Sequence, residues 1–219
     1  MRNEIKIPVN KDFSFIFNNW KDFQNKISRP YQDRFINSIY YDDENFTTAQ
    51  DNLSGISNRR KYRIRWYGSE LKNFLYEIKI KRNNLGKKIS LKTNQDKINL
   101  ENLFSFNNRF LNKKENKFFL EYLDSFNLKP QLKVSYLRSY FLYEGKIRIT
   151  FDQKINYSLV NKLHKVENKI NDFMSVIEIK FMPENYDIVL NLLKDSNFIP
   201  KRFSKYLRGL YLSGIANYI

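Results

Sequence analysis

The sequence predicts an α+β fold that is dominated by one large, mostly antiparallel sheet. Many stretches alternate charged and apolar residues as strands do, and only a few have the spacing of a helix. Gly and Pro are scarce, at 6 and 5 residues, and no stretch has the composition of a linker. The chain is 42% hydrophobic and 16% aromatic, so it should fold around a core. We therefore expect a single domain over residues 1–219.

The first half of the chain predicts four strands and three helices. The strands are 3–8, 35–42, 59–67 and 73–82, where side chains alternate in character. A helix over 12–27 is indicated by Phe13, Phe17, Trp20 and Ile27, which recur at helical spacing. The stretch "NNLGKKISLKTN" is interpreted as a loop, and helical segments follow near 96–106 and 115–126.

The second half predicts three more strands and two helices. The strands are 131–143, 146–152 and 175–182, and "YEGK" at 143–146 has the composition of a tight turn between the first two. "PENYDIVLNLLKDS" begins with Pro and Glu, which suit a helix N-terminus. Its apolar face consists of Tyr186, Val189, Leu192 and Leu193. A last helix runs from about Phe203.

The strands carry charged residues on one face and apolar residues on the other. In "KYRIRW", Lys61, Arg63 and Arg65 have one parity, while tyrosine, isoleucine and tryptophan have the other. The simplest interpretation is a sheet with its charged face in water. However, this face is nearly all Arg and Lys, and like charges about 4 Å apart repel by about 4 kcal/mol at an effective dielectric near 20. An enclosed face of this kind needs a bound anion.

A recurring Glu-x-Lys unit indicates what that anion could be. The unit occurs at Glu4 and Lys6, at Glu77 and Lys79, and at Glu178 and Lys180. Carboxylates spaced among cations suit a polyphosphate with a divalent metal, since acids hold the ion and cations hold phosphate oxygens. A barrel of about eight strands has room inside for one small ligand. We therefore expect the charged face to line a lumen and the apolar face to pack outward against helices.

Composition narrows the classes of function. The formal net charge of +16 favours an anionic partner. The absence of Cys excludes disulfides, thiolate metal sites and a Cys nucleophile, and it fits a reducing compartment. His164 is the only histidine and is expected at the surface, so a zinc site is not expected. No apolar run has the length of a signal peptide or a membrane span, so we expect a cytoplasmic protein with no integral membrane segment.

Seven motifs, in their order along the chain, resemble the VTC domain. They are "SIYYDDENFTT", "RRKYRIRWYG", "FLYEIKIKR", "VSYLRSYF", "KIRITFD", "SVIEIKF" and "RFSKY". The VTC domain is the polyphosphate-polymerase branch of the triphosphate tunnel metalloenzymes, which are related to the CYTH group. The resemblance implies a closed antiparallel β-tunnel with helices packed outside. It also implies transfer of the γ-phosphate of ATP to inorganic polyphosphate with Mn²⁺ or Mg²⁺, and thus ATP, polyphosphate and pyrophosphate as partners.

The resemblance implies a role for each matching residue. Arg63 and Arg65 look like the pair that grips the triphosphate, and Glu178 in "IEIK" resembles the metal-ligating glutamate. The other phosphate-binding residues that we expect are Lys61, Lys81, Arg138, Arg148, Ser204 and one of Lys87 or Lys88. The catalytic lysines would be Lys79, Lys180 and Lys205, and further metal ligands are expected among Glu4, Glu77 and Asp152.

Alternatives to a polymerase stay open from the sequence. A tunnel triphosphatase, which hydrolyses tripolyphosphate or nucleoside triphosphates, needs the same cations and metal. A non-catalytic module could bind polyphosphate or nucleic acid through the same basic face, although the Glu-x-Lys carboxylates would repel a nucleic-acid backbone. Surplus cations favour the polymerase, because an anionic acceptor must overcome repulsion by the triphosphate, whereas water needs a general base. The oligomeric state is left open.

Overall fold

The computed structural model describes residues 2–10, 25–82, 85–92, 100, 121, 124–161, 165–194 and 198–216. These residues form two compact units. Unit 1 consists of Met1–Phe35, Tyr136–Ile155 and Asn171–Ser204, and unit 2 consists of Ile36–Ser135, Asn156–Ile170 and Lys205–Ile219. The long strands β7 (Lys129–Tyr143) and β8 (Ile147–Leu159) contribute residues to both units. The single domain expected over 1–219 stays a prediction.

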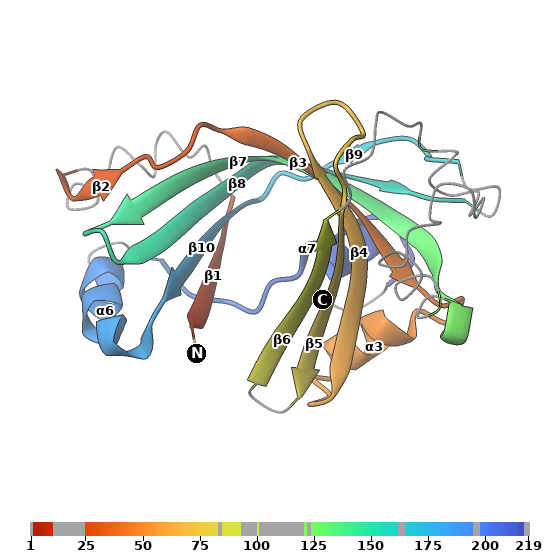
Figure 1. The fold of residues 1–219 in the computed structure, drawn as a ribbon, viewed down its shortest axis with the longest axis horizontal. Helices are drawn as coiled ribbons and strands as arrows, with labels where there is room; N and C mark the ends of the chain where they lie inside the picture. The colour runs from red at the N-terminus through yellow and green to blue at the C-terminus, as the bar shows by residue number, and fades with distance from the viewer. Residues whose placement is uncertain are drawn as a thin grey trace. The chain divides into compact units, whose positions relative to one another are not determined.

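The described part of unit 1 contains antiparallel strands and a helix (Figure 1). Strand β1 (Asn3–Val9) pairs with β10 (Ser175–Phe181), which pairs with β8, which is followed by β7. A short strand, β2 (Ile27–Ser28), pairs with the end of β7. The β7–β8 turn has Glu144 at φ 48° and Gly145 at φ 68°. Two consecutive positive φ angles are those of a type I′ turn, so the tight turn expected at 143–146 is confirmed.

The apolar face of unit 1 packs under a helix, as expected. After the short 3₁₀ helix η1 (Pro183–Asn185), helix α6 (Tyr186–Lys194) buries Val189 and Leu192. These side chains join Ile149, Phe151, Ile177 and Ile179, which share one parity of β8 and β10, in a single cluster of buried residues. Burial of this apolar face leaves the charged parity of the same strands on the opposite side of the sheet.

Unit 2 contains a second antiparallel set of strands. Strand β3 (Arg34–Asp42) pairs with β4 (Arg59–Tyr67), β4 pairs with β5 (Leu75–Arg82), and β5 pairs with β6 (Leu85–Lys92). Figure 1 shows β4, β5 and β6 side by side. One face buries Ile39, Tyr62, Ile64 and Trp66 in an apolar core, as the alternation predicts.

Helix α7 (Lys205–Leu212) is the predicted last helix, but it does not pack against the apolar face, where helices were expected. The ring of Tyr206 in α7 stacks on Tyr40, with centroids 5.0 Å apart. Tyr40 lies directly opposite Arg63 across β3 and β4, so both side chains lie on the charged face. The physical reason is that this face is not charged throughout. Near α7 the strands β7 and β8 offer the buried apolar side chains of Leu132 and Tyr157.

Two further elements differ from expectation. The stretch at 83–94 was interpreted as a loop, but Leu85–Lys92 forms β6, paired along its length with β5. Helix α3 (Thr47–Leu53) was not predicted, and it begins where the carboxylates of Asp42 and Asp43 accept hydrogen bonds from backbone N–H groups of its first turn. The expected helices at 12–27, 96–106 and 115–126 lie almost entirely outside the described residues, as does His164.

The recorded strand pairing is that of an open sheet. Its order is β1-β10-β8-β7-β3-β4-β5-β6, with β9 (Ile170–Asn171) paired to β8. The expected closed tunnel is therefore corrected, because β1 and β6 stand at the two ends of this order and no strand pairing joins them among the described residues. The antiparallel α+β class is confirmed. Within the described part of the chain, no helix is long and apolar enough to cross a membrane.

Candidate functional site

A buried glutamate gathers three cations on the charged face of unit 2. Arg63 Nε donates to Glu77 Oε2 at 2.5 Å, Arg65 Nε lies 3.9 Å from the same oxygen, and Lys88 forms an ion pair with Oε1. We call these four residues the Glu77 cluster. Glu77 is only 2% exposed. Burial by itself would raise its pKa, but the positive charges of Arg63, Arg65 and Lys88 outweigh this and lower the pKa to about 2.

Strand register decides which lysine of "GKK" joins this face. Lys88 lies directly opposite Lys79, whereas Lys87 lies opposite Ile80. Directly opposed residues share one face of a sheet, so Lys88 is on the charged face and Lys87 is on the apolar one. The same register places Lys61 opposite Lys79 and Arg59 opposite Lys81. The charged face of β4–β6 therefore continues as rows of like charges beyond the Glu77 cluster.

Tyr40 links the Glu77 cluster to helix α7. Arg63 Nη1 donates to the Tyr40 hydroxyl at 3.2 Å, and Arg65 Nε donates to Ser38 Oγ at 3.2 Å. Burial raises the pKa of Tyr40, but the charges of Arg63, Arg65 and Lys205 outweigh burial, so its pKa is lowered. Lys205, at the start of α7, therefore acts electrostatically on the same phenol as the two arginines.

Unit 1 carries a second arrangement of charges, which we call the Glu178 cluster. Its members are Glu4, Lys6, Arg138, Asp152, Glu178 and Lys180. Arg138 donates to both carboxylate oxygens of Asp152, at 2.5 and 2.7 Å, and its Nη2 lies 3.7 Å from Glu178. Lys180 forms an ion pair with Glu178 and lies 3.9 Å from Glu4. Lys180 is also the direct register partner of Glu4 and of Arg148.

Lys6 is a member of this cluster that was not expected as a site residue from the sequence. It lies directly opposite Glu178 in the register of β1 and β10, and its Nζ is 3.1 Å from Glu4. The same Nζ donates to the backbone oxygen of Phe203 at 3.2 Å, next to Ser204. The Glu-x-Lys unit at Glu4 contained the necessary signal, because Lys6 has the same parity as the acid.

The carboxylates of the two clusters differ in their availability to a metal. Asp152 is 0% exposed with both oxygens bonded to Arg138, and Glu77 is held by its own three cations. Glu4 and Glu178 are different, because the ammonium of Lys180 contacts both. One cation can therefore be shared by these two carboxylates. Among the described residues, no three acidic or histidine side chains gather as a ready metal site.

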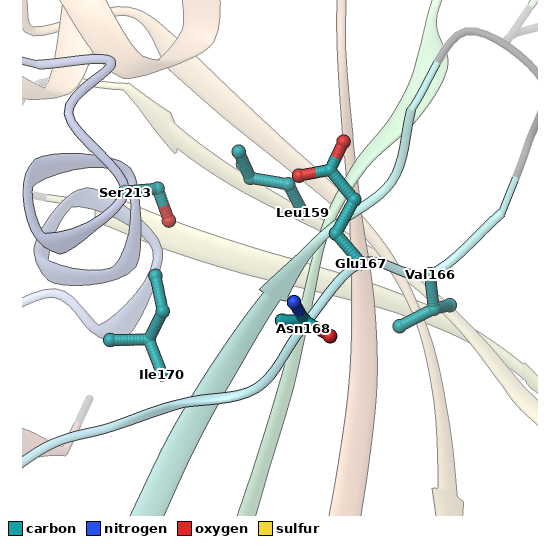
Figure 2. A pocket seen from close by; sticks show the side chains of 6 residues that line it. All are labelled: Leu159, Val166, Glu167, Asn168, Ile170 and Ser213. Carbon is teal, nitrogen blue, oxygen red and sulfur yellow. The ribbon is translucent and has the colours of Figure 1, made fainter.

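A pocket in unit 2 lies apart from these charges. It has a volume of about 460 Å³ and is lined by Leu159, Val166, Glu167, Asn168, Ile170 and Ser213, as Figure 2 shows. Leu159 belongs to β8, and Ser213 follows the last residue of α7. None of the site residues expected from the sequence lines this pocket.

Comparison with known proteins gives a family match and several similar folds. The sequence profile described as "VTC domain" matches residues 3–213. No curated protein matches the chain. Among solved structures, PH1819 of Pyrococcus horikoshii has a TM-score of 0.52 at 17% identity, over 97% of this chain and 99% of its own. A "putative adenylate cyclase" of Vibrio parahaemolyticus has a TM-score of 0.54 at 13% identity, over 96% and 97%. At these identities the likeness concerns the fold alone.

Proposed function

The chain belongs to the VTC domain family, and from this premise we propose that it is a metal-dependent phosphotransferase of the polyphosphate-polymerase type. In this proposal ATP is the donor of the γ-phosphate. The acceptor is inorganic polyphosphate, or pyrophosphate when a chain is started. Two charge clusters on the sheet faces of a VTC-type fold are the parts of the chain that we assign to this chemistry.

Arginines held in place by buried carboxylates are the observation that carries the proposal. Arg63 is bonded to Glu77 and Arg138 is bonded twice to Asp152, while the two acids are 2% and 0% exposed. A guanidinium fixed in this way is already oriented before substrate arrives. Phosphoryl transfer depends mainly on positioning and on charge stabilisation by such groups, rather than on covalent chemistry.

We assign phosphate-binding residues in each cluster by itself. In unit 2, Arg63, Arg65 and Lys88 bind phosphate oxygens, and Lys205 approaches the same phenol from α7. The rows that contain Lys61, Lys79 and Lys81 extend the positive face, which suits an anionic acceptor. In unit 1, Arg138, Arg148 and Lys180 bind phosphate, and Ser204 lies beside the backbone oxygen to which Lys6 donates.

Glu4 and Glu178 are the residues that we expect to hold a divalent metal. Their shared contact with the Lys180 ammonium indicates that a cation fits both carboxylates. Mg²⁺ is commonly held by one or two carboxylates, with water and substrate phosphates as its other ligands, so two acids are sufficient. When bound, Mn²⁺ or Mg²⁺ would neutralise charge on the phosphate oxygens. Asp152 and Glu77, also expected as ligands, are assigned instead to holding arginines.

The experiment that tests the polymerase is incubation with ATP and Mn²⁺, followed by a gel for long polyphosphate and assays for ADP and free phosphate. We expect ADP and chains long enough to resolve on the gel. Seeding with short polyphosphate should increase the yield, since the surplus cations are proposed to bind the acceptor. If ATP or tripolyphosphate yields only free phosphate, even in seeded reactions, the chain is a triphosphatase instead.

Two substitutions separate the proposed roles of acids and cations. Glu178→Gln should reduce metal-dependent turnover at least tenfold, an order-of-magnitude expectation for a metal-binding group. It should leave tripolyphosphate binding intact or tighter, because a negative charge leaves the phosphate site. Arg65→Ala should instead weaken binding itself, through loss of a charge-assisted contact. Calorimetric titration with tripolyphosphate decides, and an equal loss of affinity in both variants would contradict the assignment.

A further inference from the structure

A buried carboxylate at the end of β3 ties helix α7 to the sheet of unit 2. Asp42 is 0% exposed, and its Oδ2 accepts hydrogen bonds from the hydroxyls of Tyr206 at 2.8 Å and Thr48 at 2.7 Å. Its Oδ1 accepts from the backbone N–H of Thr48 at 2.9 Å. Burial raises the pKa of both Asp42 and Tyr206. Asp42 and Tyr206 are therefore joined by a hydrogen bond that water does not reach.

The Tyr206 side chain leads from this carboxylate to the cations of unit 2. Its ring stacks on Tyr40, with centroids 5.0 Å apart and an angle of 17° between the rings. The Tyr40 hydroxyl accepts a hydrogen bond from Arg63. Tyr206 also follows Lys205 directly in α7. The position of Tyr206 therefore sets the position of Lys205 at the start of the helix. Tyr206 thus contacts Tyr40, which orients Arg63, and it is the chain neighbour of Lys205.

Apolar packing already attaches α7 to the sheet without Asp42. Leu207 and Leu210 are buried, at 6% and 0% exposure. The helix also approaches the sheet so closely at Gly209 that an added Cβ would lie 2.5 Å from side-chain atoms of Leu132 and Tyr157. Burying a carboxylate is costly compared with more apolar packing, whereas polar networks select one arrangement among several. The Asp42–Tyr206 bond is thus suited to fixing the rotation of α7.

We propose that Tyr206 and Asp42 are positioning residues, which orient Arg63 through Tyr40 and Lys205 through α7 so that both cations bind the same phosphate group. This inference rests on the proposed function, since it concerns the affinity of that phosphate site. Neither residue needs to touch the substrate. Asp42 fixes the hydroxyl of Tyr206, and the Tyr206 ring stacks on Tyr40, whose hydroxyl accepts a hydrogen bond from Arg63.

The first test compares Tyr206→Phe with a variant that only loosens the helix. Tyr206→Phe keeps the ring but removes the donor to Asp42, and we expect it to bind tripolyphosphate about tenfold more weakly. Leu207→Val removes one methylene from the same helix and should lower the melting temperature while leaving affinity within about twofold. Both are titrated by calorimetry well below their melting temperatures. If both variants lose affinity in proportion to their loss of stability, the pair is only an anchor and the inference is wrong.

The second test asks whether Tyr206 acts through Arg63. In an Arg63→Ala background, Tyr206→Phe should weaken tripolyphosphate binding less than it does in the unsubstituted chain, because residues that act through one another are not additive. Tyr40→Phe leaves the hydrogen bonds of Asp42 intact and should also weaken tripolyphosphate binding. It therefore provides a second test if Tyr206→Phe folds poorly. Fully additive effects would overturn the inference alone. Failure of the unsubstituted chain to bind tripolyphosphate would overturn both the inference and the proposed function.

Discussion

At the scale of single residues, the carboxylates of the Glu-x-Lys units have distinct roles that depend on their cross-strand neighbours. Glu77 lies directly opposite Arg63, so its carboxylate forms an ion pair with an arginine of the neighbouring strand. Glu178 lies opposite Lys6 and Thr150, and contacts Lys180. All three acids in this pattern look equivalent in the sequence, because parity identifies a face but register determines the neighbour.

The low pKa of Glu77 predicts a specific loss of stability in acid. Its pKa in the folded chain, about 2, lies below its ordinary value of 4.5. The stabilisation of the folded state by the ionised Glu77 carboxylate is therefore complete above pH 4.5. It is lost as pH falls from 4.5 towards 2. Glu77→Gln should reduce the free energy of unfolding at pH 7 by about 3 kcal/mol, and should flatten its decline in this acid range. Urea titrations between pH 2.5 and 7 measure both effects.

A matched control for this substitution is Glu144→Gln. Glu144 makes an ion pair with Lys26, at 2.8 Å, in an exposed position. Exposed pairs contribute about 1 kcal/mol or less, so the control should change stability little at any pH. Similar pH profiles for both glutamine variants would show that Glu77 is not the centre of a stabilising cluster.

At the scale of elements, strand β6 decides which lysine serves the phosphate site. Lys88→Ala should weaken tripolyphosphate binding by about tenfold, since it removes a cation of the Glu77 cluster. Lys87→Ala removes the same charge from the neighbouring residue, but from the apolar face opposite Ile80. Lys87→Ala should change the affinity for tripolyphosphate much less, because it alters only the net charge of the chain. Calorimetry on the pair tests the register directly, and equal losses would mean that net charge alone binds the anion.

The element that was misread from the sequence shows why some of the site could not be predicted. In Leu85–Lys92, Leu85, Ile89 and Leu91 alternate with Gly86, Lys88 and Ser90, which is a strand pattern. Lys87 breaks it by placing a charge on the apolar parity, and Gly86 favours a loop. Pairing with β5 overrides both weak local signals. Arg59–Tyr67, a strand without such an interruption, was predicted with its correct bounds, whereas the strand expected at 146–152 runs over Ile147–Leu159.

The position of α7 depends on one glycine, which gives a further prediction at this scale. Gly209→Ala should reduce the free energy of unfolding by about 1–3 kcal/mol, because the new Cβ would lie 2.5 Å from Leu132 and Tyr157 atoms. Gly86→Ala is the matched control, since no atom of the described residues lies within 4 Å of a Cβ there. That variant should be neutral or slightly stabilising. Thermal and urea unfolding compare the two, and equal effects would contradict the close approach of α7.

At the scale of the whole molecule, the alternation of charged and apolar residues predicted strands with one charged and one apolar face. It did not predict whether the sheet of these strands is open or closed. Charged and apolar parities sort the side chains of β4 and β10 correctly. Whether the edge strands β1 and β6 meet another strand is not encoded in parity, because both open and closed sheets show the same alternation. The last helix was predicted, but its place on the charged face was not, since its apolar contacts come from strands far away in the sequence.

The net charge of +16 leads to the last prediction, which concerns the stability of the whole chain. Self-repulsion among cations destabilises the folded state, and an anion that binds only the folded chain relieves it. Tripolyphosphate at about 100 times its dissociation constant should therefore raise the melting temperature by about 5–10 °C, from about 2.7 kcal/mol of linkage. The rise should saturate, and differential scanning fluorimetry measures it. Sodium chloride at equal ionic strength should not reproduce this saturable rise in melting temperature, because salt screens charges generally and does not bind at one site. If single-stranded oligonucleotides gave the larger rise, a nucleic-acid-binding module would replace the phosphotransferase proposal.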